Sequence, residues 1–271
     1  MNEPFYIIEP KVKKIPFVLS VPHCGVEFPA EIKEHYDSAL IQQPDDTDWY
    51  VQDLYHFSTE LGITIIYAKY SRWVIDLNRD PDSKPLYNDG RIITALTPFT
   101  DFFGNEIYKK AEYKPNEEEV NRRLKLYYWP YYQKIEKIIA DLNKDFKEVL
   151  FWDAHSIRSY VPTIRKERFP DMILGNNDLK TARKELIATA LETLSQSNYQ
   201  VNHNTPFKGG HLTRYFGKPQ ENVHALQLEM VKSLYMEANE LDYSTAKANL
   251  VQSTLKNTFV KLIEELKNPT G

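Results

Sequence analysis

The chain alternates short apolar runs with longer segments in which apolar residues recur at helical spacing. The short runs are rich in β-branched and aromatic residues and predict strands at 16–21, 63–67, 73–77, 149–152, 199–203 and 223–230. The periodic segments predict helices at 29–36, 49–61, 116–145, 178–196 and 244–267. This alternation is typical of a mixed, mostly parallel sheet covered by helices on both faces. We therefore predict a single α/β domain over residues 1–271.

Capping and breaking residues set some of the expected element ends. Asn116 with Glu119 forms a capping pattern at the start of the third helix, and Pro130 should kink or break that helix. Gly62 should end the second helix as a C-cap. Turn-forming residues predict loops within the domain at 81–100 and a loop or hairpin at 207–215.

Composition and charge narrow the class of protein. A hydrophobic content of 42% with 27% charged residues and a net charge of −4 is ordinary for a soluble globular chain, and the absence of a long basic run argues against a nucleic-acid partner. The single cysteine, Cys24, excludes an intramolecular disulfide. The sequence has no signal-peptide core and no apolar run near the ~20 residues of a membrane helix. We expect a cytoplasmic protein without membrane contact; the sequence does not indicate its oligomeric state.

Polar residues gather where predicted strands end. His23 follows the strand 16–21, and Asp153 and His155 follow the strand 149–152. Two imidazoles and a carboxylate form a catalytic zinc site when they meet, although a hydrogen-bonded histidine at a capped strand end gives the same local pattern. No HExxH signature is present, so spacing alone is weak support. The candidate carboxylates are Glu27, Asp45, Asp46 and Asp48, for which a solvated turn (Glu27) and helix capping (the three aspartates) are the structural alternatives.

Cationic residues and one further carboxylate complete the candidate chemistry. Arg79, in the stretch Asp76-Leu77-Asn78-Arg79, is placed to bind a substrate carboxylate, or else to form a surface pair worth ~0–1 kcal/mol. Arg214 with Lys208 is a second possible anion clamp, although Lys208-Gly209-Gly210 lacks the P-loop spacing. Glu229, at the end of an apolar strand, is either paired to a base such as Arg214 or held as a general base with a raised pKa.

Taken in order, these stretches resemble the N-formylglutamate amidohydrolases over about residues 17–236. The resemblance is carried by 20–25 (Ser-Val-Pro-His-Cys-Gly), 46–49 (Asp-Thr-Asp-Trp), 71–79 (Ser-Arg-Trp-Val-Ile-Asp-Leu-Asn-Arg), 152–159 (Trp-Asp-Ala-His-Ser-Ile-Arg-Ser), 207–210 with Thr213-Arg214, and 227–229 (Gln-Leu-Glu). It implies an α/β fold of the zinc-dependent exopeptidase type, related to carboxypeptidases and aspartoacylases. Several motifs in order are more specific than any one of them.

The resemblance also implies an activity and its residues: zinc-dependent hydrolysis of N-formyl-L-glutamate to formate and glutamate, as in histidine breakdown. It makes His23 and His155 ligands of one zinc ion per chain, with another divalent metal as an alternative. It puts the third ligand in the run 46–48, where Asp48 is favoured. Glu229 becomes the general base. By the same resemblance Asn78 and Arg79 bind the substrate, and mechanism suggests that Arg72 stabilises the oxyanion and Arg214 binds a second carboxylate.

Three positions depart from the family pattern and bear on specificity. Cys24 and Glu27 stand where a small and a variable residue are expected, and a thiol beside a ligand histidine would join or perturb the site. His211 stands where an aromatic residue is frequent, so substrate preference could differ. The alternatives are another N-acyl-amino-acid amidohydrolase or carboxypeptidase-like hydrolase, and an inactive metal- or ligand-binding homologue. The presence of Glu229 argues against the inactive homologue.

Overall fold

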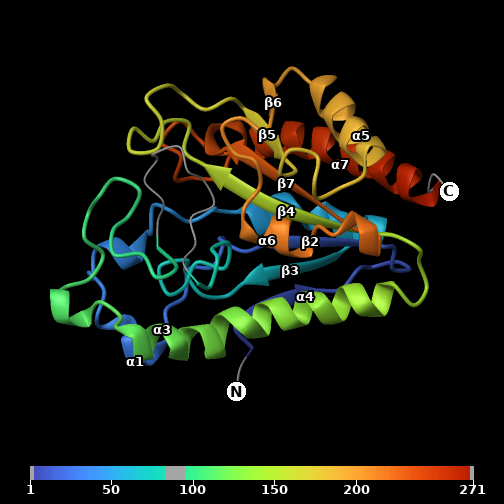
Figure 1. Cartoon of the computed structure of the whole chain (residues 1–271). Coiled ribbons are helices and arrows are strands. Elements are labelled where there is room, and N and C mark those ends of the chain that lie inside the picture. The colour runs from blue at the N-terminus through green and yellow to red at the C-terminus, as the bar shows by residue number, and fades with distance from the viewer. Residues whose placement is uncertain (1–2, 83–94, 269–271) are drawn as a thin grey trace.

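A mixed sheet forms the centre of the molecule in the computed structural model, which describes residues 3–82 and 95–268. In this part of the chain, seven strands lie in the order β1-β3-β2-β4-β7-β5-β6 (Figure 1). Their bounds are β1 Phe5–Ile8, β2 Phe17–Val21, β3 Thr64–Ala68, β4 Val149–Ile157, β5 Met172–Gly175, β6 Val201–His203 and β7 Val223–Val231.

The four central strands are parallel, as the sequence predicts. β2 pairs in parallel with β3 and β4, and β4 pairs in parallel with β7. The antiparallel pairs are β1 with β3 and β5 with β7, while β6 runs parallel to β5. Parallel strands end at the same edge of a sheet. The residues that lie near the carboxyl ends of β2, β4 and β7, or directly follow these strands, are therefore brought to one place.

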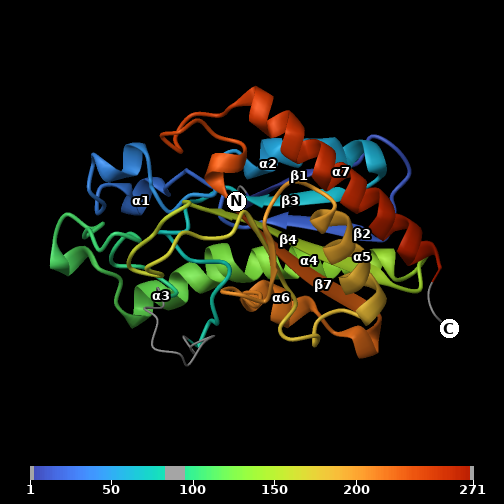
Figure 2. The same cartoon turned by 90° about the horizontal axis from the view of Figure 1, so that it is seen from above.

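Helices cover both faces of the sheet, which confirms the predicted α/β class. Figures 1 and 2 show α5 and α7 on one face and α4 on the other. The α-helices are α1 Ala30–Lys33, α2 Val51–Leu54, α3 Glu117–Arg123, α4 Trp129–Leu142, α5 Lys184–Ser195, α6 His211–Phe216 and α7 Thr245–Lys267. A π-helical turn occupies Leu124–Tyr128, and 3-10 turns lie at 40–42, 56–61, 111–113, 219–221 and 232–234. Within the described residues, none of these helices has the length and apolar character needed to cross a bilayer.

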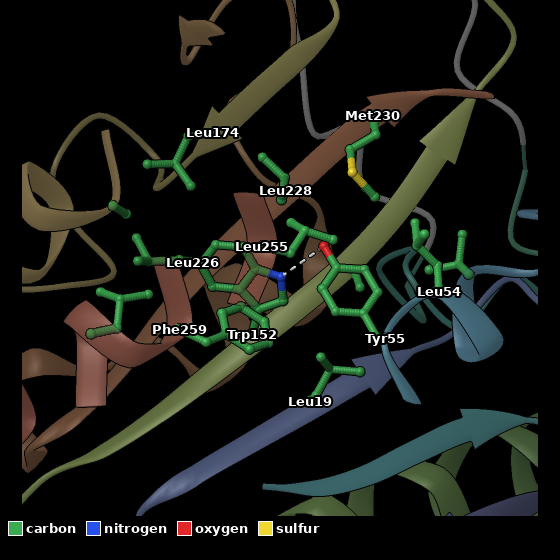
Figure 3. Packing of buried hydrophobic residues seen from close by; sticks show 14 of the residues in the cluster. Leu19, Leu54, Tyr55, Trp152, Leu174, Leu226, Leu228, Met230, Leu255 and Phe259 are labelled. Carbon is green, nitrogen blue, oxygen red and sulfur yellow. Dashed lines mark hydrogen bonds between the residues drawn. The ribbon is translucent and has the colours of Figure 1, made fainter. Parts of the chain in front are cut away.

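Alternate residues of each central strand enter two separate hydrophobic cores. Trp152 of β4 faces the core shared with α7, where its ring meets Phe259 edge-on at a centroid distance of 5.0 Å (Figure 3). Its indole Nε1 donates to the Tyr55 hydroxyl at 3.3 Å, as the dashed line in Figure 3 shows. A buried indole nitrogen needs such an acceptor. The neighbouring residue, Phe151, points into the other core, which is shared with α4 and α6.

One predicted strand is wrong. Residues 73–77 form turns, not a strand, although Trp73, Val74 and Ile75 are all buried. Their apolar character therefore reflects packing in the α4-side core and not a place in the sheet. The strands β1 and β5 were not predicted.

One predicted loop and one predicted helix also need correction. The stretch predicted as a loop or hairpin at 207–215 contains the helix α6, and the helix predicted from Asp178 begins only at Lys184. Asp178 and Leu179 adopt φ angles of 54° and 68°, which an α-helix does not allow. The predicted break at Pro130 does not occur, because the helical path continues from Glu117 to Leu142 with a π turn directly before α4. Within the predicted loop 81–100, residues 83–94 lie outside the described residues.

Candidate active site

A cavity of about 490 Å³ opens where the carboxyl ends of β2, β4 and β7 meet. Its polar side is formed by His23, Asp48, Arg72, Asn78, Arg79, His155, Gln227 and Glu229. Its apolar side is formed by Pro98, Phe99, Phe102, Ile157, Ile164 and Phe207. A chamber of this size, with a few convergent polar groups beside an apolar wall, is typical of a small-molecule site.

Three buried side chains converge on one point of this cavity. His23 follows β2, His155 lies in β4, and Asp48 lies in the turn before α2, which is fixed by a hydrogen bond from its own N–H to the His23 carbonyl at 3.0 Å. One ligand atom from each of the three lies within 4.8 Å of the others. The Asp48 Oδ2 atom is 3.1 Å from His155 Nδ1 and 3.7 Å from His23 Nδ1.

A second carboxylate lies beside the far nitrogen of each imidazole, in a hydrogen bond at His23 and at ion-pair distance at His155. His23 Nε2 lies 2.7 Å from Asp76 Oδ1, and His155 Nε2 lies 3.0 Å from Asp153 Oδ1. Carboxylates placed in this way fix the ring and tautomer of metal-binding histidines, so both Nδ1 atoms are directed at the shared point. Two imidazoles and one carboxylate, all buried and with a further carboxylate beside each imidazole, fit the donor set of a catalytic zinc ion.

The charges of His23 and Asp48 agree with this fit, whereas His155 would have to release a proton to bind a metal. Burial and, after it, nearby Arg72 lower the pKa of His23 to about 4, so this imidazole is neutral at pH 7. Burial also disfavours protonated His155, but Asp153 and Asp48 outweigh it and raise the pKa of His155 well above its ordinary value. Burial disfavours the Asp48 carboxylate, but the hydrogen bond from His155 and the charges of His23, His155 and Arg72 together outweigh burial and lower the pKa of that carboxyl. The Asp48 oxygen and the two Nδ1 atoms face one another at the point where a cation would bind.

The other candidate carboxylates point elsewhere. The Asp46 oxygens accept hydrogen bonds from Trp73 Nε1 at 3.0 Å and from the Phe102 N–H at 2.8 Å, and burial raises the pKa of Asp46 to about 6. Asp45 forms an ion pair with Arg158. Asp48 is thus the member of the run that faces both imidazoles.

Glu27 and Cys24, the two departures near His23, also lie outside the convergent group. Glu27 accepts a hydrogen bond from the exposed Tyr6 hydroxyl at 2.8 Å. The Cys24 thiol is buried and donates to the Val21 carbonyl at 3.4 Å, and burial raises its pKa well above the ordinary value. A thiol that stays protonated in the core is a packing group and not a metal ligand.

Glu229 and Arg72 flank the convergent group. Glu229 of β7 is the direct neighbour of His155 in the strand register, and burial raises its pKa to about 8. Arg72 is buried, and its Nη2 donates to Asp76 Oδ2 at 2.5 Å. Its Nε has no hydrogen-bond acceptor among the described residues. Its guanidinium lies 4.9 Å from the centroid of the Phe102 ring.

Asn78 and Arg79 also contact Asp76, and the Asn78 N–H donates to Asp76 Oδ1 at 2.9 Å. The Asn78 side chain accepts from the Leu212 N–H at 2.8 Å, and its Nδ2 lies 2.9 Å from His155 Nε2. Arg79 lines the cavity with its Nε 3.8 Å from Asp76 Oδ2. Arg72 and Arg79 outweigh burial and hold the pKa of Asp76 well below its ordinary value.

The remaining predicted residues lie outside the cavity lining in the described part of the chain. Lys208 Nζ is 2.7 Å from the exposed Asp178 carboxylate, and Arg214 Nε donates to the Gly209 carbonyl at 3.1 Å. Their predicted contact with substrate stays a prediction. His211 also lies outside the cavity lining, with its Nδ1 atom 3.9 Å from Asp80 Oδ2.

Sequence patterns gave no role to three residues that the geometry brings into the site. Asp153 was singled out beside His155 at the strand end, and side chains two positions apart on a strand face the same side. Asp76 belongs to the stretch 71–79 that carries the family resemblance, but no role was predicted for it from the sequence. Lys114, which lines the cavity beside Glu106 at 2.6 Å, carries no sequence signal.

Comparison with known proteins adds a family to this geometry. A family model described as N-formylglutamate amidohydrolase matches residues 15–236. The chain is 37% identical over 258 residues to N-formylglutamate deformylase of Pseudomonas aeruginosa, a match that covers 93% of each protein. It is 35% identical over 253 residues to that of Pseudomonas putida, covering 92% of this chain and 93% of the relative. A crystal structure of N-formylglutamate amidohydrolase from Ralstonia eutropha matches with a TM-score of 0.81 at 27% identity, covering 98% of this chain and 99% of that one.

Proposed function

The chain belongs to the N-formylglutamate amidohydrolase family, and from this premise we propose that it hydrolyses the formamide bond of N-formyl-L-glutamate. The products are formate and L-glutamate. The observation that carries the proposal is the meeting of His23, Asp48 and His155 with Glu229 in one cavity. A place in histidine degradation and a cytoplasmic location stay predictions.

We propose further that His23, Asp48 and His155 hold one zinc ion per chain. The buried donor set and the two supporting carboxylates favour zinc over harder cations, which prefer all-oxygen ligands. When bound, zinc supplies Lewis-acid chemistry and lowers the pKa of water from ~15.7 toward ~7.

Glu229 is the proposed general base. It accepts a proton from the water that attacks the formyl carbon, and it returns a proton to the nitrogen as the carbon–nitrogen bond breaks. Burial in the cavity raises its pKa to about 8, so the carboxylate binds a proton readily near neutral pH. A nearby bound cation would favour the carboxylate form and bring this pKa closer to the working pH.

Arg72 is the proposed partner of the developing oxyanion. The formyl oxygen gains negative charge as water adds, and a donor fixed before reaction stabilises that charge without reorganisation. Arg72 is held by Asp76 through Nη2, which leaves Nε without a protein acceptor in the described residues. The guanidinium is therefore fixed at the cavity wall, where we propose that it faces the oxyanion.

Cations farther out in the cavity suit the two carboxylates of the substrate. The formyl group is very small, so most binding energy must come from the glutamate part. Arg79 lies beside Asn78 on one side of the metal group, and its guanidinium can form two parallel hydrogen bonds with a carboxylate. Lys114 is the third cation, after Arg72 and Arg79, that lines the cavity in the described residues, and we assign it to the second carboxylate.

The apolar wall favours one alternative within the same reaction class. Phe99, Phe102 and Ile164 face space that a formyl group does not fill, so a longer N-acyl group is the second candidate. The test is product release from N-formyl, N-acetyl and N-butyryl derivatives of glutamate and glutamine. N-formylglutamate should give the highest kcat/KM. A preference for a longer acyl group would support the alternative, and equal cleavage of the glutamate and glutamine derivatives would contradict the two-carboxylate assignment.

A further inference from the structure

The segment 71–79 carries most of the polar groups on one side of the cavity, yet it has no regular secondary structure. It contributes Arg72, Asp76, Asn78 and Arg79. Buried carbonyl groups outside a helix or sheet need other hydrogen-bond donors. The position of the segment therefore depends on which side chains supply them.

Two tyrosines of the helical layer supply donors on both sides of Asn78. The Tyr132 hydroxyl donates to the Leu77 carbonyl at 2.7 Å, and the Tyr128 hydroxyl donates to the Arg79 carbonyl at 2.8 Å. Both tyrosines are fully buried. Their rings stack with centroids 4.3 Å apart and planes inclined by 16°.

The π turn brings these two hydroxyls to the segment. Tyr128 ends the π turn Leu124–Tyr128, and Tyr132 lies in the first turn of α4. Pro130 stands between them, lacks an N–H and crowds the carbonyl four residues earlier, which the wider turn relieves. Isolated π turns occur frequently at functional sites because they shift the face that a helix presents.

We propose that Tyr128 and Tyr132 are positioning residues that set the place of Asn78 and Arg79, and through them the binding of a substrate carboxylate. The proposal rests on the proposed function, in which Arg79 binds that carboxylate. Neither tyrosine lines the cavity in the described structure, so each acts through the backbone that it holds.

The test is steady-state kinetics of Tyr128→Phe and of Tyr128→Phe/Tyr132→Phe. We expect KM for N-formylglutamate to rise about five- to tenfold in the single variant, the range of one lost hydrogen bond, and further in the double variant. The kcat should stay within about threefold of wild type, because the Tyr128 hydroxyl contacts neither Glu229 nor the metal group.

A specificity readout separates positioning from a general loss of stability. N-formylglutamine and N-formylisoglutamine each lack one substrate carboxylate. Wild type should discriminate against both, and Tyr128→Phe should lose discrimination against only the one whose missing carboxylate Arg79 binds. Tyr127→Phe is the matched control, since this hydroxyl belongs to the same π turn but donates to Glu31 at 2.8 Å. It should leave KM and discrimination unchanged.

The outcomes for the proposal and for the function can be told apart. Wild-type turnover of N-formylglutamate tests the function by itself. If wild type prefers another N-acyl amino acid, the variants are compared on that substrate, and if it cleaves none, the positioning proposal falls with the function. Where wild type is active, unchanged KM and discrimination in the double variant would overturn the proposal, as would equal changes in Tyr127→Phe.

Discussion

At the scale of single residues, the candidate site rests on carboxylates that differ in partner and therefore in role. Asp76 and Asp153 hold the far nitrogens of the two histidines, Asp48 faces the near ones, and Glu229 remains on the cavity side. In the proposed site, the same acidic group thus serves as support, ligand or base according to the atom that it faces.

The support provided by Asp153 is testable through metal affinity. Asp153→Asn keeps the shape of the side chain but removes the charge that favours the His155 tautomer with a free Nδ1. Loss of such a partner weakens metal binding by about 10- to 100-fold. Competition with a coloured zinc chelator measures this change. Asp46→Asn is the control, because Asp46 is buried nearby but faces Trp73 and Phe102; equal affinity losses in both variants would contradict the assigned role.

The raised pKa of Glu229 predicts a pH-dependent cost to folding in the metal-free protein. The unfolded chain ionises this group near ~4.3, whereas the folded pKa is about 8, so stability is lost as pH rises through that window. Glu229→Gln lacks this cost. In urea unfolding with chelator present, the free energy of unfolding of the variant should rise relative to that of wild type by a few kcal/mol between pH 5 and pH 8. A difference between the two proteins that stays constant with pH would show that the carboxyl is not desolvated.

Residue patterns predicted the convergent histidines better than they predicted the residues around them. His23 and His155 were predicted because apolar strands deliver them to the sheet edge, and the structure brings them together with Asp48. The roles of Asp76 and Lys114 were not predicted, because their contacts are set by how the segments 71–79 and 95–114 fold over the sheet. Those segments lack a periodic pattern that would fix their path.

At the scale of elements, the errors share a physical cause. The run 73–77 is apolar because it is buried, but side chains such as Tyr132 and Arg123 satisfy its carbonyls instead of a neighbouring strand. The run after Gly209-Gly210 forms α6, although two glycines predict a loop. In both cases tertiary contacts override the local pattern, and both segments contribute to the candidate site.

Gly210 predicts a specific sensitivity at the start of α6. A Cβ atom at Gly210 would lie 2.3–2.5 Å from the side-chain amide of Asn78, so Asn78 would have to leave its place beside His155. We expect Gly210→Ala to lower kcat/KM about tenfold or more and to destabilise the fold by ~1–3 kcal/mol. Steady-state kinetics and thermal unfolding measure the two effects.

Gly62 provides the control for that substitution. A Cβ there would lie 2.5 Å from the Lys13 carbonyl oxygen, its φ of 93° strains an L-residue, and Gly62 does not line the cavity. Gly62→Ala should therefore lower stability with little change in kcat/KM. Parallel losses of activity and stability in both variants would mean that the Gly210 effect reports only strain.

At the scale of the whole molecule, the strand order assembles the site. Residues 23, 155 and 229 are far apart in sequence, but β2, β4 and β7 are consecutive neighbours in the sheet. The alternation of elements predicted a mostly parallel sheet. It did not determine the order of strands or the antiparallel β1 and β5, because short strands carry too little pattern to specify their partners.

Metal binding should therefore stabilise the entire fold. An ion bound by groups from three elements binds the folded state and not the unfolded chain, which adds ~2.7 kcal/mol at 100 times its Kd. A chelator should lower Tm, and added zinc should restore it. The variant His23→Ala/His155→Ala should show no such response. A chelator-insensitive Tm in a wild-type protein shown to contain metal would place that metal elsewhere.

The most direct test of the account is formate release from N-formyl-L-glutamate by wild type and Glu229→Gln, with zinc measured in the same samples. Wild type should release formate with about one zinc per chain. Glu229→Gln should keep its zinc and lose about 10²–10⁴-fold in kcat, because it cannot accept the proton. Wild type that holds zinc but releases no formate would contradict the proposed activity. A variant that keeps more than about a third of wild-type kcat, a difference under ~1 kcal/mol, would contradict the role of Glu229 as the base.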